Sequence, residues 1–483
     1  MATPKLTEEF MKEKIELINS PEMKNLRIED FKRFQVYNGN LKKIVEDAIR
    51  KEFKQPKQIE GLLERVVPIN IMRRIINKLA GLYIEAPVRN PRSKDESDQE
   101  LVEIYEDSMS LNQRMKEANR YFKMWKRNVA RPFVADGKPM LRNIPKFQYE
   151  VFSDNMLQPE IPDTYVEILR EDKDVEKSLY AFFTADENKI VNGKAQLQTG
   201  MMKQMNNPDG KNELGILPIV YINESSVSVN PLPDDDLLRM SILIPLLLTD
   251  LAFASKYLTW SIIWIAGYDG DIPAGPASIL TLPLDERGNH PKIGTVKPEF
   301  AMQDQLAYVE NLVTMLLTTK NLSTSSVKSN MNALAPSSGI AKALDEAQSV
   351  EDKKDQQDYF LKAEGELWKQ LHENYIPFWR KRNLLSKDFN KEFNNDFEIN
   401  VTLQEPKVTL TEEEQIKITK AKIGDDAKLS TLERELRSLN PDMDTDQVKE
   451  LEVEILEDQA KKTVIQSEMV NEMLNEDKDG QQS

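Results

Sequence analysis

The sequence contains no cysteine and only two histidines, His290 and His372. The lack of cysteine excludes disulfides and thiolate metal sites. Catalytic dyads and triads have little support, because the two histidines lie far apart and no thiol can act as a nucleophile. We therefore expect neither a metal centre nor a cofactor, and we expect that the protein is not an enzyme.

Positive charge is also scarce, with 65 Lys and Arg residues against 81 Asp and Glu residues and a net charge of -16. Contact with nucleic-acid phosphates needs clustered Lys and Arg, so this balance argues against broad non-specific binding of nucleic acid. It is compatible with a surface past which a polyanion slides without being held. The sequence does not open on a basic and apolar leader, and we expect a cytosolic protein.

Motifs for nucleotide, nuclease and calcium chemistry are incomplete. The three Gly-Lys pairs lack the glycine five positions earlier that a phosphate-binding loop needs. Pro162, Asp163 and Glu167 begin a nuclease-like pattern, but position 169 is leucine instead of lysine. Asp442, Asp444 and Asp446 have the opening spacing of a calcium loop, but its glycine and its final glutamate are replaced by Gln447 and Val453.

The composition is that of a globular protein, with 40% hydrophobic and 30% charged residues. A chain of 483 residues allows about three domains. Helical patterns dominate residues 1–66, 67–87 and 101–128. From Ala130 to Ile222 the pattern changes to short strands with polar turns, which predicts an antiparallel β region. The predicted fold class is α+β and mainly helical.

The most apolar stretch runs from Leu237 to Ala266 and predicts a helix. Asp234, Asp235 and Asp236 precede it, and carboxylates favour a helix N-terminus. A transmembrane helix needs about 18 or more apolar residues with few charges. Arg239, Asp250 and Lys256 interrupt this stretch, so we favour a helix buried between neighbouring helices or subunits.

A compact, turn-rich segment follows from Gly267 to Phe300, in which Ser278–Leu282 and Pro291–Val296 are predicted to pair as a hairpin. Met302 to Thr319 then predicts a second, returning helix.

A neutral loop and a long helix come next. Asn321 to Ser338 is rich in Ser, Asn, Thr and Ala and carries one charged side chain, Lys328. Ile340 to Tyr375 lacks proline and predicts a helix of roughly 50–55 Å that Pro377 ends. Its middle, Glu351 to Asp358, has no apolar side chain, which is typical of a helix that faces water or bridges packed regions.

Four motifs, in this order and spacing, resemble the portal proteins of tailed bacteriophages. They are Tyr37-Asn38-Gly39; the run from Asn70 to Pro87 with the pattern N-x4-I-I-N-K-x2-G-x-Y-x3-P; the segment Ser338 to Leu344; and the acidic segment from Gly424 to Glu457. The resemblance spans nearly the whole chain. The segment between the two predicted helices is shorter than the family pattern, and Pro245 interrupts the first helix.

The resemblance implies a portal fold with wing, stem, clip and crown regions, a central long helix and an antiparallel β wing. Its regions would be an N-terminal wing, 1–232; a first stem helix, 233–266; a clip, 267–300; a second stem helix, 301–320; a tunnel loop, 321–337; a long helix, 338–379; a wing return strand, 380–410; crown helices, 411–475; and a disordered tail, 476–483.

The resemblance also implies a function. Such a protein forms a ring, usually of twelve subunits, at one capsid vertex, and double-stranded DNA is packaged and ejected through the channel without sequence specificity. Its partners would be the terminase large subunit, head-completion or adaptor proteins, and the major capsid and scaffold proteins. It would be located in the virion, after assembly in the host cytoplasm.

Two residue sets carry these implied contacts. The tunnel-loop residues that would face DNA are Ser323, Thr324, Ser325, Ser326, Lys328, Ser329, Asn330 and Asn332. The clip residues that would dock terminase and connector proteins are Tyr268, Asp269, Asp271, Asp285, Glu286, Arg287, His290 and Lys292.

Two other functions remain open at this point. One is a non-viral helical scaffold or membrane-associated adaptor that uses Leu237 to Ala266 as an anchor. The other is a hydrolase acting on nucleic acid, for which the sequence offers no complete active site.

Overall fold

The structure is a computed structural model that describes residues 3–52, 56–92, 96–204, 207–258, 262–266, 292–296, 302–322, 339–389 and 391–403. The chain forms two units. The first comprises Met1–Ala333 and Glu346–Pro406, and the second comprises Leu334–Asp345 and Lys407–Ser483. The predicted crown helices and tail, residues 411–483, lie outside the described residues.

Four helices open the first unit: α1 (Glu8–Ile18), α2 (Pro21–Tyr37), α3 (Leu41–Glu52) and α4 (Pro56–Leu63). The hydroxyls of Thr7 and Ser20 cap the first two by accepting hydrogen bonds from first-turn N–H groups. A turn at Asn38 and Gly39 follows α2, and Gly39 adopts a positive φ of 103° there. The helical pattern expected for this region is thus confirmed.

Three further helices follow: α5 (Ile71–Leu79), α6 (Glu96–Met109) and α7 (Leu111–Trp125). A short strand, β1 (Val88–Pro91), precedes α6 and was not predicted. The single helical stretch expected over 101–128 is divided at Ser110, whose left-handed backbone separates α6 from α7.

Two antiparallel sheets form the predicted β region. One has the order β3-β2-β8, with β2 (Arg127–Ala135), β3 (Lys138–Ile144) and β8 (Val220–Asn223). The other has the order β4-β5-β6-β7, with β4 (Tyr149–Phe152), β5 (Thr164–Arg170), β6 (Leu179–Phe183) and β7 (Asn188–Asn192). A short helix, α8 (Thr199–Gln204), packs beside β7. The antiparallel arrangement expected from the short strands and polar turns is confirmed.

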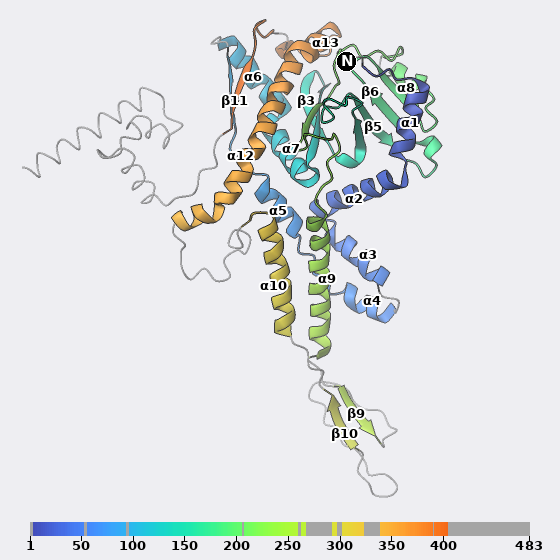
Figure 1. Ribbon diagram of the computed structural model, residues 1–483, viewed down its shortest axis with the longest axis vertical. Coiled ribbons are helices and arrows are strands. Elements are labelled where there is room, and N and C mark those ends of the chain that lie inside the picture. The colour runs from blue at the N-terminus through green and yellow to red at the C-terminus, as the bar shows by residue number, and fades with distance from the viewer. Residues whose placement is uncertain are drawn as a thin grey trace, which may run out of the picture. The chain divides into compact units, whose positions relative to one another are not determined.

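Two helices, α9 (Asp235–Leu258) and α10 (Met302–Thr319), lie side by side and run in opposite directions (Figure 1). We call them the helix pair. α9 also packs against α2, α3, α4 and α5, so it is enclosed on several sides by helices of the same chain. The second predicted helix is confirmed, because α10 has the expected limits of Met302 and Thr319.

The first predicted helix is too long at its C-terminal end. The helix ends at Leu258, and Ile262–Ala266 forms strand β9, which pairs antiparallel with β10 (Lys292–Val296). The sequence Ile-Ile-Trp-Ile explains the change, because β-branched and aromatic residues favour strands. The predicted pairing of this segment with Ser278–Leu282 stays a prediction, because 278–282 lies outside the described residues, whereas the pairing of β10 with β9 was not predicted.

The long helix continues past its predicted end. α12 (Gly339–Gln370) leads through a π-helical turn, Leu371–Tyr375, into α13 (Ile376–Lys381). Pro377 lies in the first turn of α13, where a missing N–H is tolerated. The Ile376 N–H donates to the carbonyl of Leu371 five residues earlier, so the wider turn accommodates the proline without ending the helix.

A buried ion pair fixes α12 against the N-terminal part of the chain. Arg89 of β1 donates two parallel hydrogen bonds to Glu364, with Nε–Oε2 at 2.8 Å and Nη2–Oε1 at 3.0 Å. Earlier in the same helix, within the predicted polar stretch Glu351 to Asp358, Gln356 is buried and accepts a hydrogen bond from Asn119 of α7. One face of that stretch is therefore packed instead of solvated. The predicted return strand is confirmed as β11 (Ile399–Thr402), which pairs with β1.

A second buried ion pair lies under α2. Lys146 and Glu150 are almost fully buried, and their Nζ and Oε2 atoms are 2.5 Å apart. Burial and the neighbouring Arg127 lower the pKa of Lys146 to about 8, although Glu150 opposes the shift. The pKa of Lys146 is therefore lower than that of a solvated lysine, and the Glu150 carboxylate limits the decrease.

We predict that Lys146→Met destabilises the protein by about 3–5 kcal/mol, because it leaves the Glu150 carboxylate buried without a partner. The double variant Lys146→Met with Glu150→Gln should recover most of that loss. Urea unfolding monitored by tryptophan fluorescence measures both, with the exposed Lys138→Met as the control. A double variant no more stable than the single one would contradict the pairing.

Candidate functional site at the base of the helix pair

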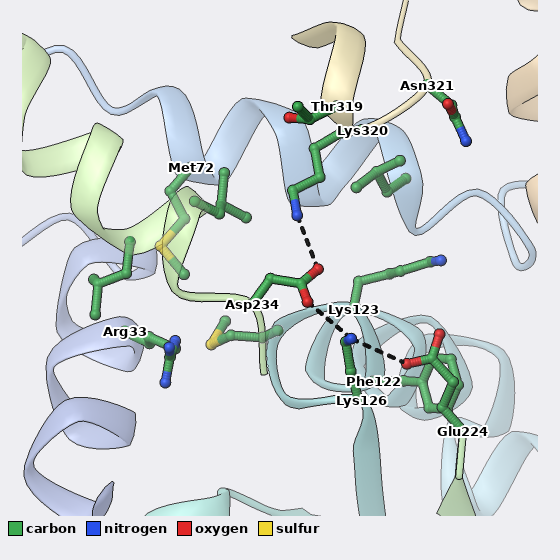
Figure 2. A pocket seen from close by; sticks show the side chains of 14 residues that line it. Arg33, Met72, Phe122, Lys123, Lys126, Glu224, Asp234, Thr319, Lys320 and Asn321 are labelled. Atoms are coloured by element: carbon green, nitrogen blue, oxygen red, sulfur yellow. Dashed lines mark hydrogen bonds and ion pairs between the residues drawn. The ribbon is translucent and has the colours of Figure 1, made fainter. Parts of the chain in front are cut away.

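Three chain segments meet at the carboxylate of Asp234, which lies just before α9 (Figure 2). Its Oδ1 is 2.8 Å from Lys126 Nζ, at the C-terminal cap of α7. Its Oδ2 is 2.8 Å from Lys320 Nζ, directly after α10. We call this arrangement the base junction. It connects the start of α9 and the end of α10 to the end of α7.

The charges at the base junction reinforce one another. Partial burial raises the pKa of Asp234, but the hydrogen bonds from Lys126 and Lys320 outweigh that effect, and the pKa is lowered overall. Lys320 also lies 3.0 Å from Asp236. Partial burial lowers the pKa of Lys126, but the hydrogen bond to Asp234 and the charge of Glu224 raise it above its ordinary value.

A second ion pair connects the start of α9 to α2. The buried Arg33 places Nη2 2.7 Å from Asp235 Oδ1 and Nη1 3.3 Å from Asp30 Oδ1. Burial raises the pKa of Asp30, opposed by Lys146, Arg127 and Arg33. The predicted role of the aspartates at this helix N-terminus is confirmed, and all three also form ion pairs with other segments.

The C-terminal end of α10 closes in a Schellman motif. The Leu322 N–H donates to the Leu317 carbonyl, and the Asn321 N–H donates to the Thr318 carbonyl. Asn321 adopts the required left-handed conformation, with φ of 53°. The side chain of Leu322 is buried with that of Leu317 in the core of the helix pair. Leu322, after which the predicted tunnel loop continues, is therefore held in place by hydrogen bonding and burial.

A cavity of about 170 Å³ lies at the base junction. Met72, Leu79, Phe122, Leu237 and Leu238 supply its apolar lining. Pockets for small organic ligands have volumes of about 300–1,000 Å³, so this one is too small for a nucleotide. Within the described ranges, no group of three or more His, Asp or Glu side chains is placed to hold a metal ion. The contacts of the base junction hold the end of α7, the start of α9 and the end of α10 together.

Most residues of the two predicted contact sets lie outside the described residues. This holds for Ser323, Thr324, Ser325, Ser326, Lys328, Ser329, Asn330 and Asn332 of the predicted tunnel loop. It holds equally for Tyr268, Asp269, Asp271, Asp285, Glu286, Arg287 and His290 of the predicted clip. Lys292 is in β10, where its Cα pairs with that of Ala266.

The base junction itself was only partly predictable. The three aspartates were recognised as a helix N-terminus, but nothing in the sequence pairs Asp234 with Lys126 or Lys320. The only usable signal was that Lys320 directly follows the end of a predicted helix, where cations are favoured, whereas Lys126 lies inside the predicted helical stretch 101–128.

Comparison with known proteins gives likenesses to solved structures and none to a known sequence family. No family model and no curated protein sequence matches the chain. A solved structure described as "Neck of empty GTA particle computed with C6 symmetry" is similar to it, with a TM-score of 0.40 and 11% sequence identity over 80% of this chain and 93% of that chain.

We predict that Asp234→Asn loosens the C-terminal end of α10, because it removes the charge that Lys126 and Lys320 share. The site is half-exposed, so the expected loss is about 1 kcal/mol, or roughly fivefold faster amide exchange. Hydrogen exchange of peptides covering Leu316 to Leu322 measures this, with the exposed Asp209→Asn as the control. Equal exchange in Asp234→Asn and wild type would contradict the role of the carboxylate.

The same junction should respond to acid. The lowered pKa of Asp234 means that the unfolded chain takes up the proton first as pH falls. The stabilisation that the Asp234 carboxylate contributes is therefore present above its ordinary pKa of 3.8. It is lost as pH falls through the lower pKa of Asp234 in the folded protein. Over that range, the amide exchange of Leu316 to Leu322 in wild type should rise to the rate of the Asp234→Asn variant. The variant itself should show no such change.

Proposed function

We propose that this protein is a subunit of a phage portal: a ring-forming channel at a capsid vertex through which DNA is packaged and ejected. The observation that carries the proposal is the helix pair, whose apolar surface is only partly covered within one chain. In this proposal the protein catalyses no reaction, and a separate ATPase supplies the energy.

The uncovered surface includes a stripe on α10. Tyr308 is 50% exposed and Met315 is 62% exposed. These residues are seven positions apart, so they share one face of the helix, while Val309 and Leu316 are buried against the chain's own core. Leu243 of α9 is also exposed. Leaving such side chains in water costs about 25 cal/mol per Å² relative to burying them, and a neighbouring subunit would bury them.

The order of elements supports the portal assignment over other ring proteins. A helix leads to a pair of antiparallel strands, a second helix returns, and the chain then passes through residues 323–338 to the 32-residue helix α12. This is the order that the sequence resemblance implies for stem, clip, stem, tunnel loop and long helix. In the proposal, the base junction holds the two stem helices in a fixed relation to the start of the tunnel loop.

The finer assignments follow from the same proposal. A ring of twelve subunits would surround double-stranded DNA, with the tunnel loop and Lys328 making weak, exchangeable contacts to the phosphates. The clip would dock the terminase large subunit and, later, head-completion proteins. The major capsid and scaffold proteins would contact the ring in the virion.

One observation favours a second candidate, a membrane-associated adaptor. Over Asp235–Ser255, α9 is long and apolar enough to cross a membrane, with a mean hydropathy of 1.8. Against this, α9 contacts α2, α3, α4, α5 and α10 of its own chain. Flotation with lipid vesicles separates the two, because an anchored adaptor partitions with lipid and a portal subunit does not.

We predict that the protein purified without detergent forms particles of about 670 kDa, the mass of twelve subunits of 55.7 kDa. Tyr308→Glu with Met315→Glu should leave most of the protein monomeric, because two carboxylates would have to be buried at the contact. Mass photometry measures both.

The matched control is Gln303→Glu with Ala307→Glu, which adds the same charge to exposed positions on another face of α10. It should assemble as wild type does. If the control and the Tyr308 and Met315 variant assemble equally well, the contact does not use this stripe of α10.

A further inference from the structure

The helices α5 and α7 carry a concentration of positive charge that contrasts with the rest of the chain. Together they hold seven Lys and Arg residues and a single carboxylate, Glu117, in a protein whose net charge is -16. The two helices pack against each other. The cations are Arg73, Arg74, Lys78, Arg114, Lys116, Arg120 and Lys123.

The cations of the two helices converge near Tyr37. Burial raises the pKa of Tyr37, and the charges of Arg120 and Arg73 act on it in the opposite direction. Its hydroxyl donates a 2.8 Å hydrogen bond to Asn77, on the same exposed side of α5 as Arg73. On α7, Lys116, Arg120 and Lys123 recur at a spacing of three to four residues and share one face. We call the residues Arg73, Arg74, Lys116 and Arg120 the basic face.

The cations of the basic face have no carboxylate partner among the residues that the structure describes. None of its four cations forms an ion pair with a carboxylate of the described residues. Arg73 and Arg74 are exposed, and Lys116 and Arg120 are partly buried. The Nε atom of Arg120 is buried without a hydrogen-bond partner among the residues described. Among the described residues, the four cations of the basic face are therefore not engaged by a carboxylate and can bind an anion.

The composition of the basic face favours a nucleic acid over a protein partner. The cores of protein interfaces are depleted in charged residues and rich in apolar and aromatic ones. In the described chain, no large apolar side chain of α5 or α7 is exposed. Guanidinium groups with few apolar neighbours suit the phosphates of a DNA backbone, to which Arg can donate two hydrogen bonds at once.

The location of the basic face agrees with this ligand. Met72 and Leu79 of α5 and Phe122 and Lys123 of α7 line the cavity at the base junction, beside Asn321. Figure 2 shows Lys123 and Asn321 at that cavity. The basic face thus belongs to the two helices that flank the point where the predicted tunnel loop begins.

We propose that the basic face binds the phosphate backbone of double-stranded DNA. The proposal deepens the portal function and rests on it for the source of the DNA, but it assigns the contact to α5 and α7 in addition to the loop at 323–332. Binding is electrostatic and independent of sequence. It weakens as salt rises, with a slope of about -0.9 in log affinity against log salt for each phosphate neutralised.

The test is fluorescence anisotropy of a labelled 30-base-pair DNA duplex with the full-length protein, over a series of salt concentrations. Arg73→Gln with Arg120→Gln should weaken binding about tenfold or more at low salt and reduce the salt slope by about 2. The charge-conserving pair Arg73→Lys with Arg120→Lys should keep the slope. Lys138→Gln with Lys173→Gln removes two exposed charges elsewhere and should leave both quantities unchanged.

Three results would overturn the proposal. The first is that the wild-type protein does not bind the duplex at low salt. The second is that the Gln pair binds with the affinity and slope of wild type. The third is that the Gln pair binds DNA normally but no longer self-associates by mass photometry, which would make the basic face a contact with a second copy of this chain. Thermal unfolding of each variant confirms that it is folded.

These results are distinguishable from a failure of the portal function. Rings that form normally while the Gln pair keeps full DNA affinity would overturn the basic face alone. Conversely, a protein that forms no rings but loses DNA affinity in the Gln pair would support the basic face and contradict the portal function.

Discussion

The arrangement of the helix pair depends on one carboxylate. Asp234 accepts hydrogen bonds from Lys126 and Lys320, which are remote from each other in the sequence, and so brings the start of α9, the end of α10 and the end of α7 to one point. The Arg33–Asp235 pair adds α2 to the same point. Because the Schellman motif follows directly, the same contacts also hold Leu322 in place. A change in the direction of the helix pair would therefore move Leu322, after which the predicted tunnel loop continues.

Charge is distributed unevenly over the chain, and this matters for a protein proposed to surround DNA. The net charge of -16 limits non-specific attraction. The neutral segment from Asn321 to Ser338 offers few strong contacts, which suits DNA that must move. The basic face on α5 and α7 is a local exception. In a channel, a small number of strong contacts beside weak ones would hold DNA in place without preventing its passage at each step.

Several elements were predictable from the sequence because local forces decide them. The β region consists of short strand-forming runs separated by polar turns, the apolar period of α10 indicates a helix, and the aspartates before α9 favour a helix N-terminus. Other features were missed because distant contacts or competing preferences decide them. The run Ile262–Ala266 is apolar enough for a helix, but its β-branched residues pair with Lys292–Val296. Pro377 ends no helix because a π-helical turn precedes it. The pairing of Asp234 with Lys126 and Lys320 depends on the packing of α7, α9 and α10, which no local pattern reveals.

The central claim is that the exposed apolar surface of the helix pair is covered by further copies of the same chain around a channel. Negative-stain electron microscopy of the full-length protein without detergent tests this most directly. The proposed assembly predicts closed rings with a central channel of uniform subunit number. Particles of single-subunit size at micromolar concentration, with no ring in any class average, would contradict it.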